Sequence, residues 1–297
     1  MFDYKLLHAL SIVIKQQSFE KAANEMCITQ SAVSQRIRLL EQNLGQPVLI
    51  RSQPIALTAI GARLLTHYQQ VQLLEQDIQP DIDANNKSEL VNINIASNAD
   101  SLAIWLTDAL NEVAHEHKVA ANILISDEER TIQYLKRGEV FGAISTQQKP
   151  LPGCMVDLLG NMEYALVANP AFIERYFGRG INKESLMQAP AVAFDQKDNM
   201  HIKFIEEEFG LKGGSYPCHT VRSSEAFVDF ATKGLAYCLI PKLQIEEQLN
   251  TGLLVNLLPK SGVTRTLYWH RWALLKGVFK ILSNSILYKA KHVLPYE

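Results

Sequence analysis

The chain has 297 residues, 47% of them hydrophobic and 20% charged, with a formal net charge of −2 at pH 7. This length exceeds a typical single domain and the apolar content suffices for at least two cores, so we expect a small domain and a larger one. No apolar run approaches the roughly 18 residues of a membrane-spanning helix, and the N-terminus lacks a basic start followed by an apolar core, so neither membrane insertion nor secretion is indicated and a cytoplasmic location is expected.

The charge is distributed unevenly along the chain. Residues 1–65 contain seven basic and four acidic side chains, a formal charge of +3, so the remainder carries −5. A protein that coats nucleic acid without sequence preference would be basic throughout. A modest positive excess at one end of an acidic chain instead indicates a DNA-binding head on a larger body.

Three helices and a hairpin are predicted in the basic segment. Residues 4–15 repeat apolar side chains at helical spacing. Ser18 is a candidate N-cap for a second helix, and Thr29 for a third helix after a short turn. Residues 44–58 combine a glycine and two prolines with a β-rich run, which predicts a small wing. This order predicts a winged helix-turn-helix whose third helix enters the major groove of double-stranded DNA.

The third helix separates apolar from polar side chains. Val33, Ile37 and Leu40 form an apolar stripe at steps of four and three residues. The opposite face carries glutamine, serine and arginine, which hydrogen-bond to base edges, whereas a generic solvated helix would more often carry glutamate and lysine. The predicted contacts to DNA, the last of them from the wing, are Gln30, Ser31, Ser34, Gln35, Arg36, Arg38 and Arg51.

A long amphipathic helix is predicted from Thr58 to about Gln79, before Pro80 and a polar hinge at 81–89. Its apolar stripe packs either on its own domain or on the helix of a second chain. The dimer would explain specificity, because one small head alone makes few contacts with DNA. The two-fold symmetry of a dimer would match an interrupted palindrome in the DNA. The residues predicted to pair two chains are Leu64, Tyr68, Val71, Leu74 and Ile78.

From about Leu90 the sequence alternates short β-rich runs with helical patterns, which is typical of an α/β fold with mostly parallel sheets. Ligands bind such sheets at the carboxyl ends of the strands. Each polar residue there is, taken alone, better explained as a helix cap or a solvated acid. Together, serines that suit a carboxylate and acids that suit ammonium or guanidinium predict a site for a cationic amino acid. The expected effector-binding residues are Ser97, Asn98, Asp100, Ser101, Glu129, Thr146, Asp195, Ser223 and Ser224.

An enzyme is the main alternative class. The sequence lacks a G-x-S-x-G motif, a phosphate loop, an H-E-x-x-H motif and a dinucleotide fingerprint. Trp269, His270 and Arg271 could form a reactive cluster, but an aromatic strand packed at a lobe interface is the favoured interpretation. The four cysteines are widely spread without a CxxC pair, so free thiols are expected. We therefore expect no catalytic residue, metal or cofactor.

Residues 18–51, SFEKAANEMCITQSAVSQRIRLLEQNLGQPVLIR, followed by LTAIG, resemble the signature of LysR-type transcriptional regulators. The alanine pair, QSAVS, LE, LG and LT-x-x-G occur in order at that family's spacing. Further along, SNADSLAIWL, ERTIQYLKRGEV, PAVAFD, SSEAFV and LYWHR are similar to the ArgP-like subgroup, and the resemblance covers the full length. One departure is Pro54, where many members carry an arginine, which implies weaker contact between the wing and phosphates.

The resemblance implies an order of domains and an effector. It implies a head at 1–58, a linker helix and hinge at 59–89, and an effector-binding domain at 90–297 built like periplasmic binding proteins. Lobe I would comprise 90–161 and 268–297, and lobe II 162–267. ArgP-like regulators respond to lysine and arginine and control export or metabolism of basic amino acids. A LysR-type regulator of another metabolite and an amino-acid-acting enzyme are the alternatives; dimer or tetramer, and activator or repressor, stay open.

Overall fold

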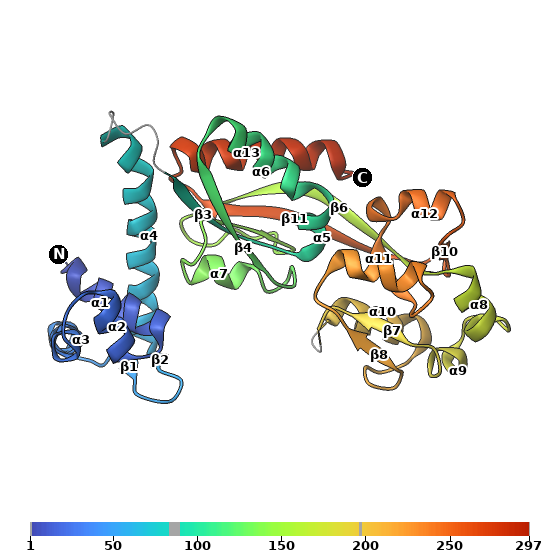
Figure 1. The fold of residues 1–297 in the computed structure, drawn as a ribbon, viewed down its shortest axis with the longest axis horizontal. Helices are drawn as coiled ribbons and strands as arrows, with labels where there is room; N and C mark the ends of the chain where they lie inside the picture. The colour runs from blue at the N-terminus through green and yellow to red at the C-terminus, as the bar shows by residue number, and fades with distance from the viewer. Residues whose placement is uncertain (1, 83–89, 196–197, 297) are drawn as a thin grey trace.

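The computed structural model describes residues 2–82, 90–195 and 198–296, without the side chains of 73 and 76–82. A helical N-terminal domain is followed by one long helix and by an α/β body of two lobes (Figure 1). The predicted fold class is therefore confirmed: a mixed α/β chain with a winged helix-turn-helix head, a linker helix and a two-lobed body.

The head is a three-helix domain with a small wing. Ser18 caps the second helix by accepting a hydrogen bond from the Lys21 amide, and Thr29 caps the third by accepting from the Ala32 amide. The alanine side chains of the second helix are buried, so the helices approach closely. The elements are α1 (Tyr4–Gln16), α2 (Phe19–Glu25), α3 (Gln30–Leu44) and the antiparallel strands β1 (Leu49–Ile50) and β2 (Ala56–Leu57).

The linker helix α4 (Ala59–Ile82) begins inside the head and runs alongside lobe I (Figure 1). The prediction that Pro80 ends this helix is wrong by two residues, because α4 continues to Ile82. Proline removes a donor and crowds the preceding turn, so a helix can extend for part of a turn beyond it but not much further. The predicted hinge residues 83–89 lie outside the described residues.

Backbone groups of lobe I contact the linker helix directly. The Thr66 hydroxyl donates to the Lys136 carbonyl at 3.2 Å. A Cβ placed on Gly138 would lie 3.0 Å from the Gln69 Cβ and 3.2 Å from the Thr66 carbonyl oxygen. The absence of a side chain at Gly138 therefore allows lobe I to approach the helix this closely.

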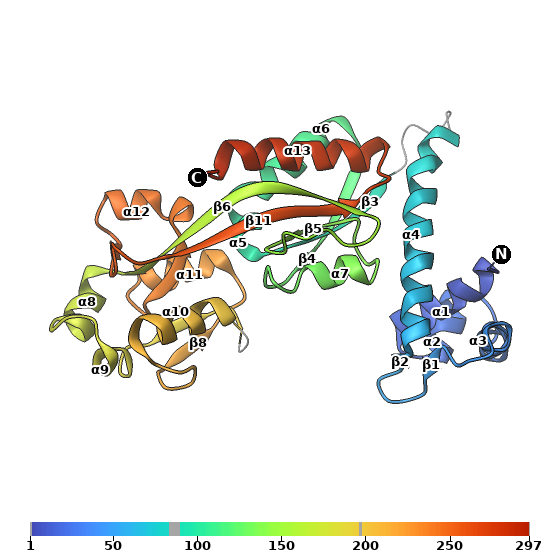
Figure 2. The same ribbon diagram turned by 180° about the vertical axis from the view of Figure 1, so that it is seen from behind.

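Lobe I is a sheet covered by helices on both faces. Strands β3, β4 and β5 are parallel, and the long strands β11 and β6 extend the sheet antiparallel beside β5. Helices α6 and α13 lie on one face and α7 on the other (Figures 1 and 2). The elements are β3 (Val91–Ser97), α5 (Ala99–Ser101), the π-helical turn η1 (Leu102–Leu106), α6 (Thr107–Glu116), β4 (Val119–Ile125), α7 (Ile132–Lys136), β5 (Gly142–Ser145), β6 (Cys154–Ala168), β11 (Val263–Trp272) and α13 (Gly277–Val293).

Lobe II is built on the far half of the same long strands. β9 and β10 pair with β6, and β7 pairs in parallel with β8. The elements are α8 (Pro170–Phe177), α9 (Lys183–Leu186), β7 (Ala191–Ala193), α10 (Asn199–Phe209), β8 (Cys218–Thr220), α11 (Ser224–Thr232), β9 (Cys238–Pro241), the 3-10 turn η2 (Lys242–Gln244), α12 (Glu246–Asn250) and β10 (Val255–Asn256).

Strands β6 and β11 cross from one lobe to the other as an antiparallel pair (Figure 2). At the crossing Thr266 donates to the Asn161 side-chain oxygen at 2.8 Å, and the register shifts between Leu267 and Tyr268. Trp269 is fully buried in the lobe I core, where its indole donates to Ser283 on α13 at 2.8 Å. The aromatic strand is confirmed, but its tryptophan packs inside lobe I and not at the lobe interface.

Candidate functional site

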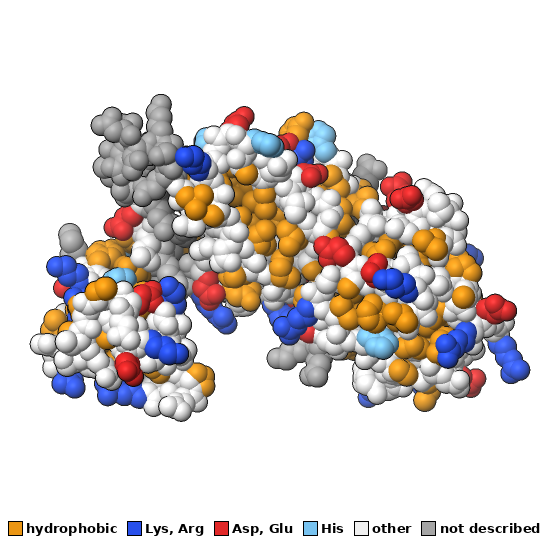
Figure 3. Space-filling model, in the orientation of Figure 1, with side chains coloured by type: hydrophobic (Ala, Val, Ile, Leu, Met, Phe, Trp, Pro, Cys, Tyr) orange, Lys and Arg blue, Asp and Glu red, His pale blue; other side chains and the backbone are white. Residues whose placement is uncertain are grey.

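The polar face of α3 is open to solvent. Val33, Ile37 and Leu40 are at most 3% exposed and turn into the head. Arg51 in the wing is exposed, with its guanidinium 6.0 Å from the Phe19 ring centroid. Figure 3 shows Lys and Arg side chains on the lower part of the head, near α3 and the wing. The predicted contacts on α3 divide by exposure: Gln30, Ser31, Gln35 and Arg38 are exposed, and Ser34 and Arg36 are half-buried.

The residues predicted to pair two chains divide along α4. Leu64 and Tyr68 are buried in the core of the head, so they offer little surface to a partner. Val71 is half-buried and Leu74 is 40% exposed. The side chain of Ile78 lies outside what the structure describes. The part of α4 beyond the head therefore carries the remaining apolar surface of the predicted seam.

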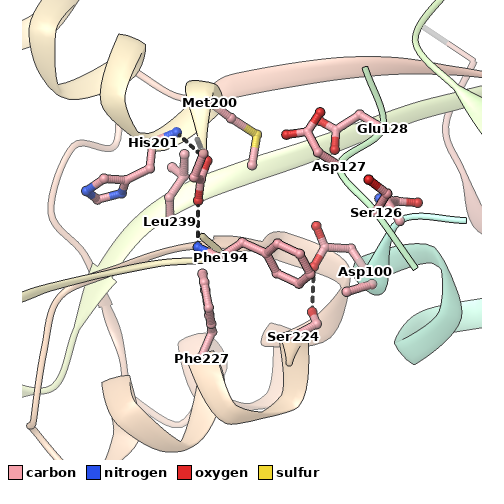
Figure 4. Close-up of a pocket in the computed structure, with 13 residues that line it drawn as sticks. Asp100, Ser126, Asp127, Glu128, Phe194, Met200, His201, Ser224, Phe227 and Leu239 are labelled. Carbon is pink, nitrogen blue, oxygen red and sulfur yellow. Dashed lines mark hydrogen bonds between the residues drawn. The ribbon is translucent and has the colours of Figure 1, made fainter. Parts of the chain in front are cut away.

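A cavity of about 50 Å³ lies between the two lobes. Lobe I contributes the start of α5 and the loop after β4, and lobe II contributes the start of α10, the start of α11 and β9 (Figure 4). These are carboxyl ends of strands and amino ends of helices, which is where α/β folds place their ligands. The lining side chains include Asn98, Asp100, Ser126, Asp127, Glu128, Phe194, Asp198, Met200, His201, Ser224, Phe227 and Leu239.

Asp100 ties the two lobes together at the floor of this cavity. Its carboxylate accepts hydrogen bonds from the Ser224 hydroxyl of lobe II at 2.5 Å and from the Tyr164 hydroxyl on β6 at 2.6 Å. Burial raises the pKa of Asp100, and these two hydrogen bonds oppose that shift. Asp100 and Ser224 were both predicted as site residues, and the structure brings them into contact.

Two further acids stand side by side in the loop after β4 (Figure 4). Burial and, after it, the neighbouring charge of Asp127 raise the pKa of Glu128 to about 7. Burial also raises the pKa of Asp127. The Arg265 guanidinium approaches Glu128 at 3.5 Å, which opposes the shift without cancelling it. The cavity wall therefore contains the buried Glu128 beside the half-buried Asp127, and burial disfavours the ionised form of both.

Asp195 does not line the cavity, although the sequence predicted it as a contact for a cation. Its carboxylate accepts from Arg130 of lobe I at 3.0 Å and lies 3.8 Å from Arg222. Its negative charge is already compensated by two guanidinium groups. The structure makes Asp195 part of an ion pair between the lobes.

The other predicted site residues lie around the cavity but do not line it. Ser97 is buried and its hydroxyl donates to the Asn98 carbonyl, while the buried Ser101 hydroxyl has no partner within the described part of the chain. Glu129 is exposed and lies 3.6 Å from Arg265. Thr146 donates its amide to the Glu128 carbonyl, and Ser223 caps α11.

Sequence analysis missed the contribution of α10. Asp198 caps this helix and accepts from the amides of Phe194 and His201, and Met200 and His201 follow in its first turn. Burial lowers the pKa of His201 to about 4, so the ring is neutral near pH 7. An aspartate directly before a helical pattern is a capping signal. That signal could have located α10, but not its position opposite lobe I.

Asn98 and His201 are buried polar side chains of the cavity without a hydrogen-bond partner among the described residues. Asn98 is 3% exposed, and neither its amide nitrogen nor its amide oxygen has a hydrogen bond to any residue that the structure describes. It stands directly before α5, where main-chain N–H groups also face outward. Free donors beside buried acids can hold a molecule that carries a carboxylate and a cation.

Two other kinds of site are not found in the described ranges. Within residues 2–82, 90–195 and 198–296, no three or more His, Cys, Asp or Glu side chains are grouped so that they could hold a metal ion. None of the helices in those ranges has the length and apolar character of a membrane span.

Two family models match this chain. Residues 4–62 match the model for the bacterial regulatory helix-turn-helix protein, lysR family, and residues 90–272 match the LysR substrate binding domain. Among curated relatives, the HTH-type transcriptional regulator ArgP of Aeromonas salmonicida is 49% identical over 292 residues, which is 98% of both chains. ArgP of Photobacterium profundum is 48% identical over 293 residues, 99% of this chain and 98% of that protein.

Solved structures match the whole chain as well. The crystal structure of ArgP from Mycobacterium tuberculosis matches with a TM-score of 0.85 and 29% identity, covering 100% of both chains. Full-length LysG from Corynebacterium glutamicum with bound effector arginine matches with a TM-score of 0.78 and 28% identity, covering 99% of this chain and 100% of that one. The two lobes described above thus have a counterpart in a protein that holds arginine.

Glu128→Gln should stabilise the empty protein at high pH. A buried carboxyl whose pKa rises from 4.5 to about 7 on folding lowers the free energy of unfolding as pH rises through that window. Removing its charge should raise the free energy of unfolding at pH 8 by on the order of 2 to 3 kcal/mol, with a smaller gain at pH 5. Chemical denaturation at both pH values measures the difference, and an equal effect at both would contradict it.

Proposed function

Because the chain belongs to the LysR family of bacterial transcriptional regulators, we propose that it binds an operator in the cytoplasm and that lysine or arginine modulates its activity there. It is a regulator and not an enzyme. We assign DNA binding to 1–58, linkage and dimerisation to 59–89, and effector binding to 90–297, with lobe I at 90–161 and 268–297 and lobe II at 162–267. Its target genes would serve export or metabolism of basic amino acids.

The exposed polar face of α3 supports the assignment of the DNA contacts. Arginine can donate two hydrogen bonds to guanine and glutamine can pair with adenine, so exposed Arg38, Gln30 and Gln35 are suited to read base edges. Arg36 is half-buried and Arg51 lies on the wing, positions that suit contacts to phosphate. Ser31 and Ser34 complete the proposed surface.

Arg38→Ala should relax the choice of sequence. A good bidentate contact contributes on the order of 1–3 kcal/mol of discrimination between bases, so the ratio of affinities for operator and scrambled DNA should fall about tenfold or more. Titration of both DNAs by fluorescence anisotropy at one salt concentration measures this ratio. Arg179→Ala, which removes an exposed arginine from lobe II, is the control and should leave the ratio unchanged. Full discrimination by Arg38→Ala would remove Arg38 from the proposed surface.

The surface left on α4 supports a dimer through the linker helix. Val71 and Leu74 lie beyond the core of the head and keep part of their apolar surface exposed. Burying that surface against a second α4 would recover hydrophobic free energy and place two heads on one DNA. The proposed operator is therefore an interrupted palindrome, and the assembly a homodimer or homotetramer.

Val71→Asp should weaken the dimer, because it would bury an unpaired carboxylate in the seam. Analytical ultracentrifugation of the dilute protein should show a shift to the monomer, with a loss of operator affinity of at least tenfold. Ala62→Asp, at an exposed position on the same helix, is the matched control. A Val71→Asp protein that stays dimeric and binds DNA normally would place the interface elsewhere.

The acid-rich cavity between the lobes is the observation that carries the effector assignment. Asp100, Asp127 and Glu128 can face an ammonium or guanidinium group, while Asn98 and the first amides of α5 can face a carboxylate. The arginine bound by LysG supports this class of ligand. A site for a neutral or acidic metabolite would leave these acids without a cation.

The size of the cavity indicates that binding moves the lobes. About 50 Å³ holds one or two water molecules, which is far less than an amino acid occupies. We infer that the lobes part when the ligand enters, and the 3.0 Å contact between Arg130 and Asp195 opposes their parting. A ligand that binds the open arrangement better shifts the balance between the two, and a coupling of roughly 1–3 kcal/mol changes transcription several-fold.

Calorimetry should detect binding of lysine or arginine and no binding of glutamate or leucine at pH 8. Asp127→Asn should weaken the basic ligand about tenfold, because it removes a charge-assisted contact. Asp229→Asn, the same change on the exposed side of α11, should leave affinity unchanged. No heat with either basic amino acid, and no change in the DNA footprint, would refute the effector while leaving the DNA-binding assignment intact.

A further inference from the structure

Negative charge around the cavity is only partly compensated. Asp100, Asp127 and Glu128 come from lobe I, and Asp198 comes from lobe II. Arg265 on β11 lies 3.5 Å from Glu128 but also 3.6 Å from Glu129 outside the cavity. The lobe I wall therefore contains acids that cannot all be ionised cheaply while the cavity is empty.

A second observation indicates that the lobe I side of the cavity binds a ligand. Arg130 lies 3.9 Å from Asp127, yet its hydrogen bond goes to Asp195 at 3.0 Å. Asn98 lines the cavity, is buried, and has both amide atoms unpaired. Buried amides without partners are uncommon in folded chains, so this one indicates a group that binds in the cleft.

We propose that effector binding is coupled to proton release, with Glu128 as the group that gives up the proton. In the empty cleft Glu128 is a neutral carboxylic acid for a large part of the molecules. When the ligand's ammonium or guanidinium enters, the O–H bond breaks, the proton passes to solvent, and the carboxylate pairs with the cation. The inference rests on the proposed function, because it requires a cationic effector in this cavity.

Glu128 differs from its two acidic neighbours in what satisfies it. The Asp100 carboxylate accepts two hydroxyl hydrogen bonds, and the Asp127 carboxylate accepts the Glu129 amide at 2.8 Å. Glu128 is 6% exposed, and its carboxylate has its own main-chain amide and the ion pair with Arg265, at 3.5 Å, as partners. Burial and the charge of Asp127 raise the pKa of Glu128 to about 7, within the range in which cells operate.

Of the groups near Glu128, Tyr164 and His201 stay neutral between pH 6 and pH 8, while burial raises the pKa of Asp100 and of Asp127 as it does that of Glu128. Tyr164 on β6 has its pKa raised well above 10 by burial. Burial lowers the pKa of His201 on α10 to about 4, so this ring stays neutral. Asp198 faces the cleft as the N-cap of α10 and accepts two amide hydrogen bonds.

The direction of the effect follows from linkage. A cation beside Glu128 favours the ionised form and lowers its pKa in the complex, so the complex binds fewer protons than the empty protein. Affinity must then rise with pH and level off above the pKa of the empty site. With a pKa of about 7, affinity should rise about tenfold between pH 6 and pH 8.

Isothermal titration calorimetry of the full-length protein with arginine tests this directly. Titrations at pH 6, 7 and 8, each in two buffers of different ionisation enthalpy, give both the affinity and the number of protons released. We expect a tenfold gain in affinity from pH 6 to pH 8 and release of about one proton per site at pH 6, falling towards zero at pH 8.

Two variants identify the group. Glu128→Gln should bind arginine weakly at every pH, and its affinity should no longer depend on pH. Any pH dependence that comes from the amine of the ligand itself would remain in this variant. Glu139→Gln is the matched control, because burial also raises the pKa of Glu139 but this residue lies beside Arg137, outside the cavity. It should keep the tenfold dependence.

Each outcome separates the two proposals. Arginine that binds with the same affinity at pH 6 and pH 8, without proton release, would overturn the coupling and leave the effector assignment standing. A Glu128→Gln protein that keeps the full dependence on pH would also overturn it, and if this variant does not fold, the proton count of the unaltered protein decides. Absence of binding at every pH would refute both.

Discussion

The pairing of β6 with β11 is the constraint on which the body of this protein depends. Both strands contribute to both lobes: one half of the β6–β11 pair belongs to the sheet of lobe I, and the other half belongs to the sheet of lobe II. The ends of β3 and β4 are thereby held opposite the starts of α10 and α11. Because the two lobes share these strands, the loops at the edge of one lobe face the loops at the edge of the other. The cleft lies between these loops.

The acidic side chains of the cleft are less fully compensated than those of a purely structural interface would be. The Asp100 carboxylate accepts from hydroxyls on β6 and α11, while the buried Glu128 carboxylate accepts no side-chain hydroxyl within the described residues and lies 3.5 Å from Arg265. Uncompensated buried charge lowers stability and concentrates at functional sites. Polar contacts that cross the lobes include those from Asp100 to Ser224 and from Arg130 to Asp195.

Local signals in the sequence were enough for the head and for the order of elements. Ser18 and Thr29 act as the caps they resemble, and the face of α3 is exposed as its spacing indicates. The cleft was harder. Asn98, Asp100 and Ser224 line it as strand-end loops should, but Asp195 meets an arginine 65 residues away in sequence, and α10 faces lobe I only because the lobes are folded together. Side-chain contacts between segments that are distant in sequence produce no periodic pattern in the sequence.

The seating of α4 against lobe I determines what can move. Thr66 hydrogen-bonds to the backbone at the end of α7, and Gly138 lies against the same stretch of helix without a side chain between them. The head packs on the first turns of the same helix through Leu64 and Tyr68, so one helix contacts both the head and lobe I. A change in the position of lobe I would therefore reach the head through this shared helix.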